Sequence, residues 1–151
     1  MSIHGGKDNI VDNNLFIDCG TAFVQASWGQ ENWESRLDRG DVAKHLKERN
    51  ITRPPYSTRY PELSTLRQDA DRNFIWRNLV VKCGTPVSTR TDANQVVELI
   101  VLTEDPGFAA PGKLDFRLAP DAPIFARSSF RRIPFERIGL YEHELRASKI
   151  R

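Results

Sequence analysis

The chain has 151 residues, of which 39% are hydrophobic, and a mean hydropathy of −0.51, which is typical of a single water-soluble domain. Its 22 basic and 20 acidic residues leave a formal charge of +2, so no strong field favours nucleic acid or an anionic bilayer as a partner. No run approaches the roughly 18 apolar residues of a membrane helix. Residues 1–7 also lack the apolar core of a secretory signal.

The central feature of the sequence is a motif that occurs twice. Residues 9–24 read NIVDNNLFIDCGTAFV, and residues 73–88 read NFIWRNLVVKCGTPVS. The residues that recur at a constant offset of 64 positions are Asn9, Asn14, Leu15, Cys19, Gly20 and Thr21. Self-similarity at a fixed register is typical of repeat architectures, so we expect the two copies to be stacked coils of one fold.

Within each copy, the apolar residues come in bursts of two or three that are separated by turn-favouring residues. Such bursts are too short for an amphipathic helix and indicate very short strands joined by tight corners. In a coil of this kind Asn14, Phe16 and Cys19 point inward, in register with Asn78, Val80 and Cys83. A buried amide without a partner costs on the order of 1–3 kcal/mol, so we expect Asn14 and Asn78 to pair.

Residues 25–72 depart from the repeat and predict a helical insertion between two coils. A helical pattern runs from Gln30 to Asn50, with a break at Gly40 and with Asp41 as a cap of its second half. Pro61 marks the start of a further short helix. Long ordered insertions of this kind are often functional.

Residues 94–125 predict a terminal coil that lacks the Cys-Gly-Thr corner, because residues 94–103, NQVVELIVLT, are the most strand-like segment of the chain. Residues 126–151 predict a C-terminal cap. We expect this cap to lie across the open end of the stack and to cover a sheet edge there. The whole chain is thus expected to form one domain.

Several segments together resemble one protein family, the right-handed parallel β-helix repeat proteins of the pectate-lyase-like group, at their C-terminal end. The segments that carry the resemblance, by residue number, are 5–9 (GGKDN), 14–19 (NLFIDC), 54–63 (PPYSTRYPEL), 105–108 (DPGF), 115–118 (DFRL), 120–123 (PDAP) and 133–141 (IPFERIGLY). The resemblance implies an all-β fold, a short right-handed parallel β-helix of about three coils with a helical insertion and a C-terminal cap.

The resemblance also implies a function. Many members of the group act on polysaccharides, so the chain is expected to be the C-terminal part of a secreted, carbohydrate-active protein, a polysaccharide lyase or a glycoside hydrolase. The implied partners are a polysaccharide or oligosaccharide and the missing N-terminal coils of a larger β-helix, and the implied location is extracellular or periplasmic. The alternative is a non-catalytic module that binds glycan, caps a solenoid or mediates assembly, since one solenoid hosts many activities.

The chain departs from the family pattern at one place. Relatives often carry a His and an Asp shortly after the first Cys coil, where this chain reads Val24-Gln-Ala-Ser-Trp-Gly29. Asp12 and Asp18 lie in the first coil, but the second copy replaces them with Trp76 and Lys82, so no ladder of carboxylates forms. No catalytic residue is therefore assigned, and an incomplete active site is expected.

Metal and cofactor chemistry find little support in the sequence. Cys19 and Cys83 are compatible with a disulfide, a metal pair or reactive thiols, but two small buried hydrophobic residues stacked at a corner are the favoured interpretation. The histidines at positions 4, 45 and 143 are too scattered for a metal motif. Calcium is common among the lyases of the resembled group, but no acidic cluster argues for it, and no cofactor is identified.

The insertion carries the residues that best suit substrate binding. Aromatic side chains of the sort that stack on sugar rings, and arginines that could clamp a carboxylate or sulfate, occur together at Trp28, Trp33, Arg53, Tyr56, Arg59 and Tyr60. Packing is the competing interpretation. Trp33 has helical spacing to Leu37, and Tyr60 precedes a helix start, so both are also candidates for holding the insertion on the coils.

Overall fold

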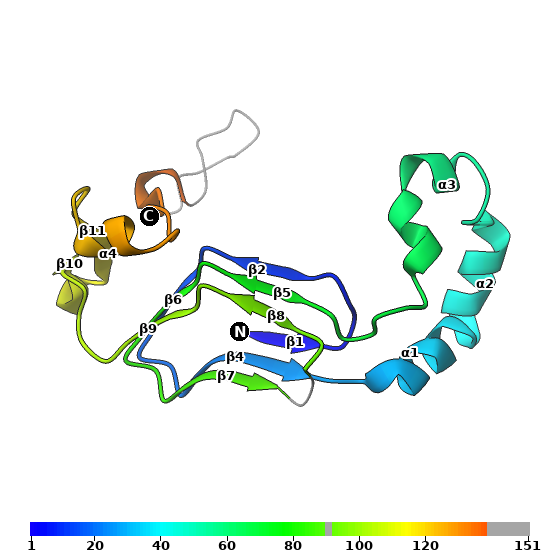
Figure 1. Ribbon diagram of the computed structural model, residues 1–151, viewed down its shortest axis with the longest axis horizontal. Coiled ribbons are helices and arrows are strands. Elements are labelled where there is room, and N and C mark those ends of the chain that lie inside the picture. The colour runs from blue at the N-terminus through cyan, green and yellow to red at the C-terminus, as the bar shows by residue number, and fades with distance from the viewer. Residues whose placement is uncertain (90–91, 139–151) are drawn as a thin grey trace, which may run out of the picture.

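The computed structural model describes residues 1–89 and 92–138, and strands β1 to β9 form three stacked parallel sheets (Figure 1). Sheet A contains β1 (Ser2–His4), β4 (Thr21–Ala26) and β7 (Thr85–Thr89) in that order. Sheet B contains β2 (Ile10–Asp12), β5 (Phe74–Trp76) and β8 (Gln95–Val97). Sheet C contains β3 (Leu15–Ile17), β6 (Leu79–Val81) and β9 (Ile100–Leu102). The predicted short parallel strands are confirmed.

The register of the strands follows the sequence repeat. In all three sheets, residues of the first copy lie opposite residues 64 positions later, as in Ile10 with Phe74, Leu15 with Leu79 and Thr21 with Thr85. A third layer continues sheets B and C, where Gln95 pairs with Phe74 and Ile100 pairs with Leu79. Sheet A gains its third strand from β1, which pairs with β4 and was not predicted from the sequence.

The interior of the stack is apolar because alternate residues of each strand point to the same side. Val11, Phe23 and Ile75 are each 1% exposed, and Ile3 of β1 packs with them. Three partly buried side chains complete this cluster, namely Phe16, Val87 and Leu99. Phe16 thus lies on the inner side, as does its register partner Val80, which is fully buried, and both are as expected.

Two columns of asparagine hold successive layers together. The Oδ1 atom of Asn78 accepts hydrogen bonds from the backbone N–H of Asn14 at 2.9 Å and from its Nδ2 at 3.0 Å. The Oδ1 atom of Asn73 accepts the same two bonds from Asn9, at 3.0 and 2.8 Å. Asn73 and Asn78 are both fully buried. The predicted pairing of Asn14 with Asn78 is confirmed, and Asn9 with Asn73 repeats it.

Residues 27–72 form a helical arm that extends from the sheets at one side (Figure 1). Its helices are α1 (Gly29–Leu37), α2 (Gly40–Arg49), α3 (Tyr56–Arg59) and the 3₁₀ helix η1 (Pro61–Thr65). The predicted break lies just before Gly40, at Asp38 and Arg39, and Gly40 begins α2 with a φ of 59° that favours glycine. The prediction that Asp41 caps α2 is wrong, because α2 begins one residue before it and Arg39 holds the cap position without a side-chain bond.

The base of the arm is closed by one buried carboxylate. Asp71, at the end of the arm, accepts hydrogen bonds from the Ser27 hydroxyl at 2.6 Å and from the backbone N–H groups of Trp28 and Gly29 at 3.0 and 2.6 Å. Burial opposes ionisation of Asp71, but these hydrogen bonds outweigh it and lower its pKa. The carboxylate therefore satisfies N–H groups at the start of α1 and ties the two ends of the insertion together.

Residues 105–138, here called the C-terminal segment, pack on the outer face of sheet C. They contain the antiparallel pair β10 (Phe108–Ala110) and β11 (Asp115–Leu118), the helix α4 (Pro123–Arg127) and the 3₁₀ helices η2 (Pro111–Lys113) and η3 (Phe135–Arg137). Phe130 is 4% exposed in a cluster with Leu79 and Val81, against which Ile133 also packs.

This placement corrects the expectation that the predicted cap lies across the open end of the stack. Up to residue 138 the chain instead covers the apolar side chains that β3, β6 and β9 turn away from the interior. These strands carry apolar residues on both faces, so a second layer is needed to remove the outer ones from water. The remainder of the predicted cap, residues 139–151, lies outside the described residues.

Candidate functional site

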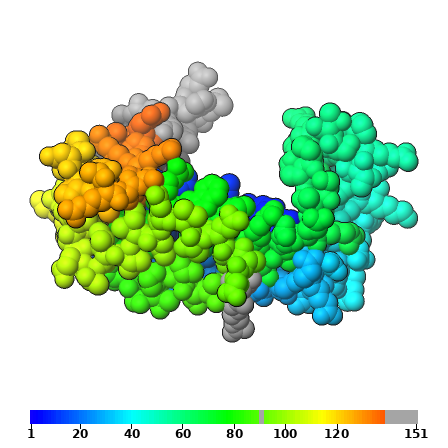
Figure 2. Space-filling view, in the orientation of Figure 1, coloured from blue at the N-terminus to red at the C-terminus, as the bar shows by residue number. Residues whose placement is uncertain are grey.

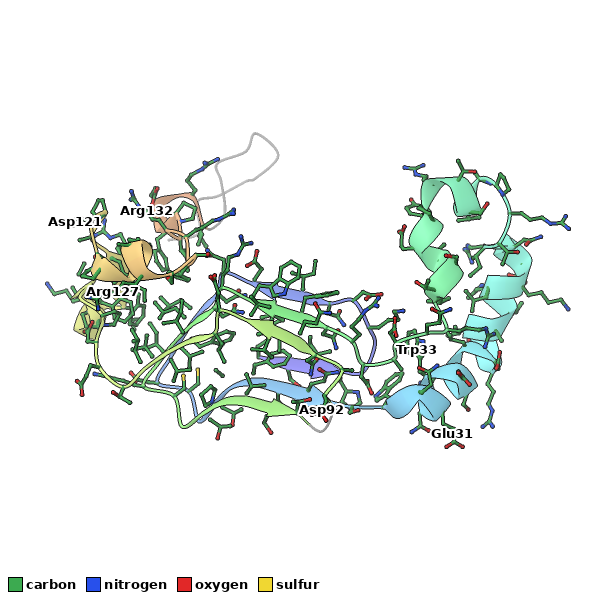
Figure 3. All side chains as sticks on the ribbon, viewed as in Figure 1. Glu31, Trp33, Asp92, Asp121, Arg127 and Arg132 are labelled. Carbon is green, nitrogen blue, oxygen red and sulfur yellow. The ribbon has the colours of Figure 1, made fainter. Side chains whose placement is uncertain are left out.

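Two of the six predicted binding residues, Trp28 and Trp33, pack at the base of the arm. Trp28 lies against Gly5, where no side chain would fit, and its ring is covered by the guanidinium of Arg36 at 4.5 Å. Trp33 donates a hydrogen bond from Nε1 to the carbonyl oxygen of Leu66 at 2.8 Å, which joins α1 to the end of η1 (Figure 3). Both rings thus stabilise the base of the arm, which agrees with the packing interpretation of these two residues.

The other four predicted residues lie in and beside α3, which Figure 1 shows at the far end of the arm. The Arg59 guanidinium lies over the Tyr60 ring at 5.5 Å, and Tyr60 is 40% exposed. Arg53 is exposed, and Tyr56 is half-buried. The structure thus separates the six residues into a packed pair at the base and an accessible group at the tip.

A second set of apolar side chains, with two half-buried aromatic rings at its centre, lies on the outer side of sheet B, and we call it the aromatic face. It consists of Ile10 from β2, Phe74 and Trp76 from β5, and Val97 from β8. Phe74 and Trp76 flank the inward Ile75, so the pleat turns both rings outward. Their centroids lie 5.1 Å apart with an interplanar angle of 60°. Ile10 is 61% exposed and Val97 is 51% exposed beside them.

Two arginines frame the aromatic face. Arg77 forms a two-pronged ion pair with Asp12, in which Nε donates to Oδ1 at 2.8 Å and Nη2 donates to Oδ2. Arg72 lies 5.9 Å from the centre of the Phe74 ring and bridges Asp8 and Asp69, with nitrogen-to-oxygen distances of 2.7 and 2.6 Å. Apolar rings are thus bordered by fixed hydrogen-bonding groups, the usual composition of a ligand surface.

The aromatic face lies between the two parts of the molecule that rise from the sheets. Before β2, the Lys7 ammonium donates hydrogen bonds to the carbonyl oxygens of Thr65 and Gln68 in the arm, at 2.9 and 2.6 Å. After β2, Asn13 exchanges two hydrogen bonds with the backbone of Arg131 in the C-terminal segment. Figure 2 shows the surface hollowed between the arm and the C-terminal segment.

The carboxylate of Asp12, whose strand position pairs with Trp76, is suited to binding rather than to acid catalysis. The hydrogen bonds from Arg77 are the main cause that lowers the pKa of Asp12, and burial opposes them. A general acid in glycoside hydrolysis needs the opposite shift, a raised pKa that keeps its proton near neutral pH. Asp12 is therefore a poor candidate for that role. Asp18 lies at the following corner with a positive φ of 50°.

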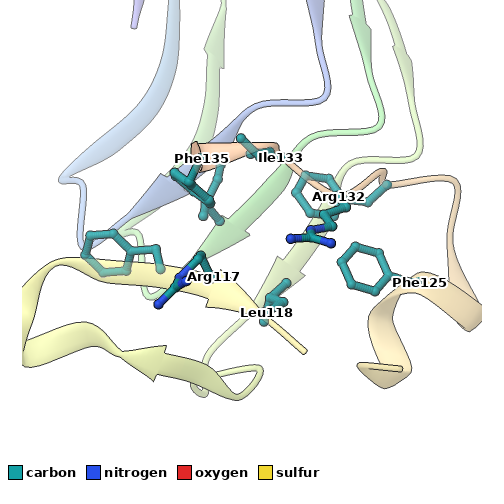
Figure 4. Close-up of a pocket in the computed structure, with 9 residues that line it drawn as sticks. Arg117, Leu118, Phe125, Arg132, Ile133 and Phe135 are labelled. Atoms are coloured by element: carbon teal, nitrogen blue, oxygen red, sulfur yellow. The ribbon is translucent and has the colours of Figure 1, made fainter. Parts of the chain in front are cut away.

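The C-terminal segment encloses little free space. The cavity in Figure 4, among Leu118, Phe125, Ile133 and the stem of Arg132, has a volume of about 10 Å³, enough for one water molecule at most. A wider groove of about 600 Å³ runs along β3, with Phe116, Ile133 and Phe135 on its other side. Its walls are mainly apolar, and its polar groups are those of the β3 edge and the adjoining corners.

Metal binding finds no support in residues 1–89 and 92–138, which contain no group of three or more His, Cys, Asp or Glu side chains placed to hold an ion. Within the same ranges no helix has both the length and the apolar character to cross a membrane. Cys19 and Cys83 are free thiols, half-buried and stacked in successive layers, as their offset in the sequence predicts.

Comparisons with protein-family models, with curated proteins and with solved structures found no significant match to this chain. The class of protein is therefore defined by the architecture alone, namely short strands in three stacked parallel sheets with a helical arm.

Strand alternation in the sequence is a signal for the aromatic face, although Phe74 and Trp76 are not among the recurring residues of the motif. Once Val11 and Ile75 are placed inside, the alternation of a strand puts Ile10, Phe74 and Trp76 outside. The repeat itself does not show this signal, because Trp76 of the second copy is equivalent to Asp12 of the first.

Proposed function

We propose that this chain is part of a right-handed parallel β-helix protein of the pectate-lyase-like group and that it binds polysaccharide on the aromatic face. The architecture that supports this proposal is the in-register stacking of three parallel sheets with asparagine columns at their corners. The single observation that carries the binding function is the outward pair Phe74 and Trp76 between two arginine ion pairs.

The physical basis is the match between a sugar ring and this surface. The C–H groups of a pyranose carry a small positive charge and pack on the negative face of an aromatic ring, while its hydroxyls require hydrogen-bonding partners at the rim. Phe74 and Trp76 supply the rings, and the carboxylates and guanidinium groups of the two ion pairs supply donors and acceptors whose positions are already fixed. Fixed groups lose little conformational entropy on binding.

The charge of the rim indicates which polysaccharides to expect. Arg72 and Arg77 are balanced by Asp8, Asp12 and Asp69, so the rim carries no excess of positive charge. A polyanion would therefore gain little from electrostatic attraction. We expect neutral chains such as xylans or glucans to bind at least as tightly as polyuronates. The exposed Arg59 and Tyr60 at the tip of the arm are a second contact for a chain that reaches beyond sheet B.

The test is a binding and activity survey of the full chain. Neutral and acidic polysaccharides are incorporated into native gels, and the retardation of the protein is compared with that of a non-binding reference protein. The same polymers are incubated with the protein and assayed for unsaturated uronate absorbance and for new reducing ends. Binding with product formation supports a lyase or hydrolase, and binding without it supports a non-catalytic glycan-binding module. The absence of retardation by every polymer overturns the proposal.

A second candidate function, assembly with another β-helix, is favoured by the exposed end of the interior. Val96 and Val101 lie in register with the buried Ile75 and Val80, yet they are 46% and 47% exposed. A further parallel coil from another chain would cover them and pair with β8 and β9. Sedimentation velocity over a range of concentrations tests this function. Self-association that Val96→Glu abolishes supports it, and a concentration-independent monomer argues against assembly with a second copy.

A further inference from the structure

The two cysteines occupy the same corner of successive layers, where the strands of sheet C turn into those of sheet A. Backbone hydrogen bonds on both sides of the pair fix the register, from the N–H of Gly84 to the carbonyl of Cys19 at 2.9 Å and from the N–H of Asp18 to the carbonyl of Val81 at 3.0 Å. Neighbouring strands lie about 4.8 Å apart, which falls within the Cα separation of roughly 4.4–6.8 Å that a disulfide requires.

The side chains at this corner already lie close together. The backbone N–H of Cys19 donates to the Sγ atom of Cys83 at 3.3 Å, so the sulfur of Cys83 is on the side of its neighbour. Each thiol lies near the carbonyl oxygen two residues before it, at 3.4 Å for Cys19 and 3.5 Å for Cys83. The two thiols thus share one orientation, and the sulfur of Cys83 already lies at the backbone of Cys19.

We propose that Cys19 and Cys83 form an intramolecular disulfide in the folded protein when a small disulfide oxidant, such as oxidised glutathione, is present. One cysteine thiolate attacks the oxidant, forms a mixed disulfide and releases one reduced glutathione. The second thiolate then attacks the protein sulfur of that mixed disulfide and releases the other glutathione. The protein loses two electrons and two protons, which appear in the two reduced glutathione molecules.

The consequence for the fold is a covalent link between the first two layers. The link closes the chain from residue 19 to residue 83, a loop that contains the entire helical arm. Because it restricts the unfolded chain over a long loop, it should raise the melting temperature by about 10 °C. Burial raises the pKa of the Cys83 thiol, so the step in which the Cys83 thiolate attacks should accelerate as the pH rises above neutrality.

The experiment compares full-length protein that has been incubated, without denaturant, with reduced or oxidised glutathione. Intact mass spectrometry should show the loss of two hydrogen atoms and no retained glutathione. Tryptic digestion without reduction should then yield the peptide that contains Cys19 joined to the peptide that begins at Cys83. The melting temperature of the oxidised form should exceed that of the reduced form, and the difference should vanish after addition of dithiothreitol.

The controls are the single variants Cys19→Ser and Cys83→Ser, each of which is checked for native circular dichroism before use. Each should retain one glutathione instead of losing hydrogen, because no second thiol resolves the mixed disulfide. The proposal is overturned if the wild-type protein keeps stable glutathione adducts, if it links only between molecules, or if it remains unmodified while folded.

Discussion

Asn78 receives two hydrogen bonds from Asn14 through a single oxygen atom, one from the backbone and one from the side chain. Its own amide donates to the carbonyl of Val11 at 2.8 Å, so its side chain is satisfied although it is fully buried. An apolar residue of the same size could fill the space but could not satisfy the N–H and C=O groups of the corner. The asparagine column is therefore a requirement of the backbone as well as a link between layers.

The first prediction concerns this column. Asn78→Leu should lower the free energy of unfolding by about 2–4 kcal/mol, because it leaves buried groups of Asn14 and Val11 without partners. Asn14→Leu should lower it less, since Asn14 is only half-buried and accepts no corresponding bond from another asparagine in the described chain. Urea denaturation of the three proteins measures the difference. Equal stability of Asn78→Leu and the wild type would contradict the role given to the column.

The second prediction uses the two glycines of the Cys-Gly-Thr motif as a matched pair. A Cβ atom on Gly84 would lie 2.9 Å from the carbonyl oxygen of Gly20 in the layer above, whereas a Cβ atom on Gly20 would meet nothing within 4 Å. Gly84→Ala should therefore cost about 1–3 kcal/mol of stability, and Gly20→Ala should change it by less than about 0.5 kcal/mol. Thermal unfolding of both variants is the measurement. Equal losses at both positions would show that the layers do not approach as described.

The third prediction concerns the carboxylate that closes the arm. Asp71→Asn should cost about 1–3 kcal/mol at pH 7, because the carboxylate accepts bonds on both oxygens, from Trp28 on one and from Ser27 and Gly29 on the other, whereas the amide has a single acceptor oxygen. The asparagine tolerates the positive φ of 64° at this position, so the backbone is not strained by the change.

The loss of stability caused by Asp71→Asn should become smaller as the pH falls. The folded-state pKa is lowered relative to an unfolded value of about 3.9, so the contribution is complete above that value and is lost as the pH falls through the folded pKa. The difference between the wild type and Asp71→Asn should thus be constant from pH 7 to pH 5 and should shrink below pH 4. Asp69→Asn is the control, because the exposed ion pair of Asp69 with Arg72 should contribute at most about 0.5 kcal/mol.

The fourth prediction tests the aromatic face. Trp76→Ala should weaken polysaccharide binding about tenfold, the equivalent of one stacked ring, while the protein stays folded. Tyr60→Ala removes an exposed ring at the tip of the arm and should reduce affinity by less than about twofold unless the arm is the principal contact. Isothermal titration calorimetry, with the polysaccharide that retards the protein most in the native gels, measures the affinity of each variant. A larger loss for Tyr60→Ala than for Trp76→Ala would move the site from sheet B to the arm.

The repeat made much of the fold predictable. A constant offset of 64 residues fixed which strands pair and in which register, and each of those pairings is present in sheets A, B and C. The helices α1 and α2, with a break just before Gly40, and the start of η1 at Pro61 also followed from local signals, whereas α3 was not predicted. Such features depend on chain periodicity and backbone geometry, which the sequence encodes locally.

The strand β1 and the position of the C-terminal segment were not predictable in the same way. Residues 2–4 carry no repeat signal, and they form a strand because the free edge of β4 supplies hydrogen bonds to them. The strands β3, β6 and β9 are visibly apolar on both faces as runs of three apolar residues, but which segment covers their outer side is decided only when residues 105–138 pack there in the folded chain.

The candidate site also has a part that was predictable from the sequence and a part that was not. The sequence by itself determined that Asn, Cys and Gly residues stack at the corners, since any parallel coil with this register brings equal positions together. Only the tertiary structure decided which aromatic side chains are free to meet a ligand. Trp33 and Trp76 are the same type of residue. The Trp33 ring holds two parts of the arm together, whereas the Trp76 ring is turned outward from sheet B. Exposure depends on what packs against a side chain, and those neighbours come from distant parts of the chain.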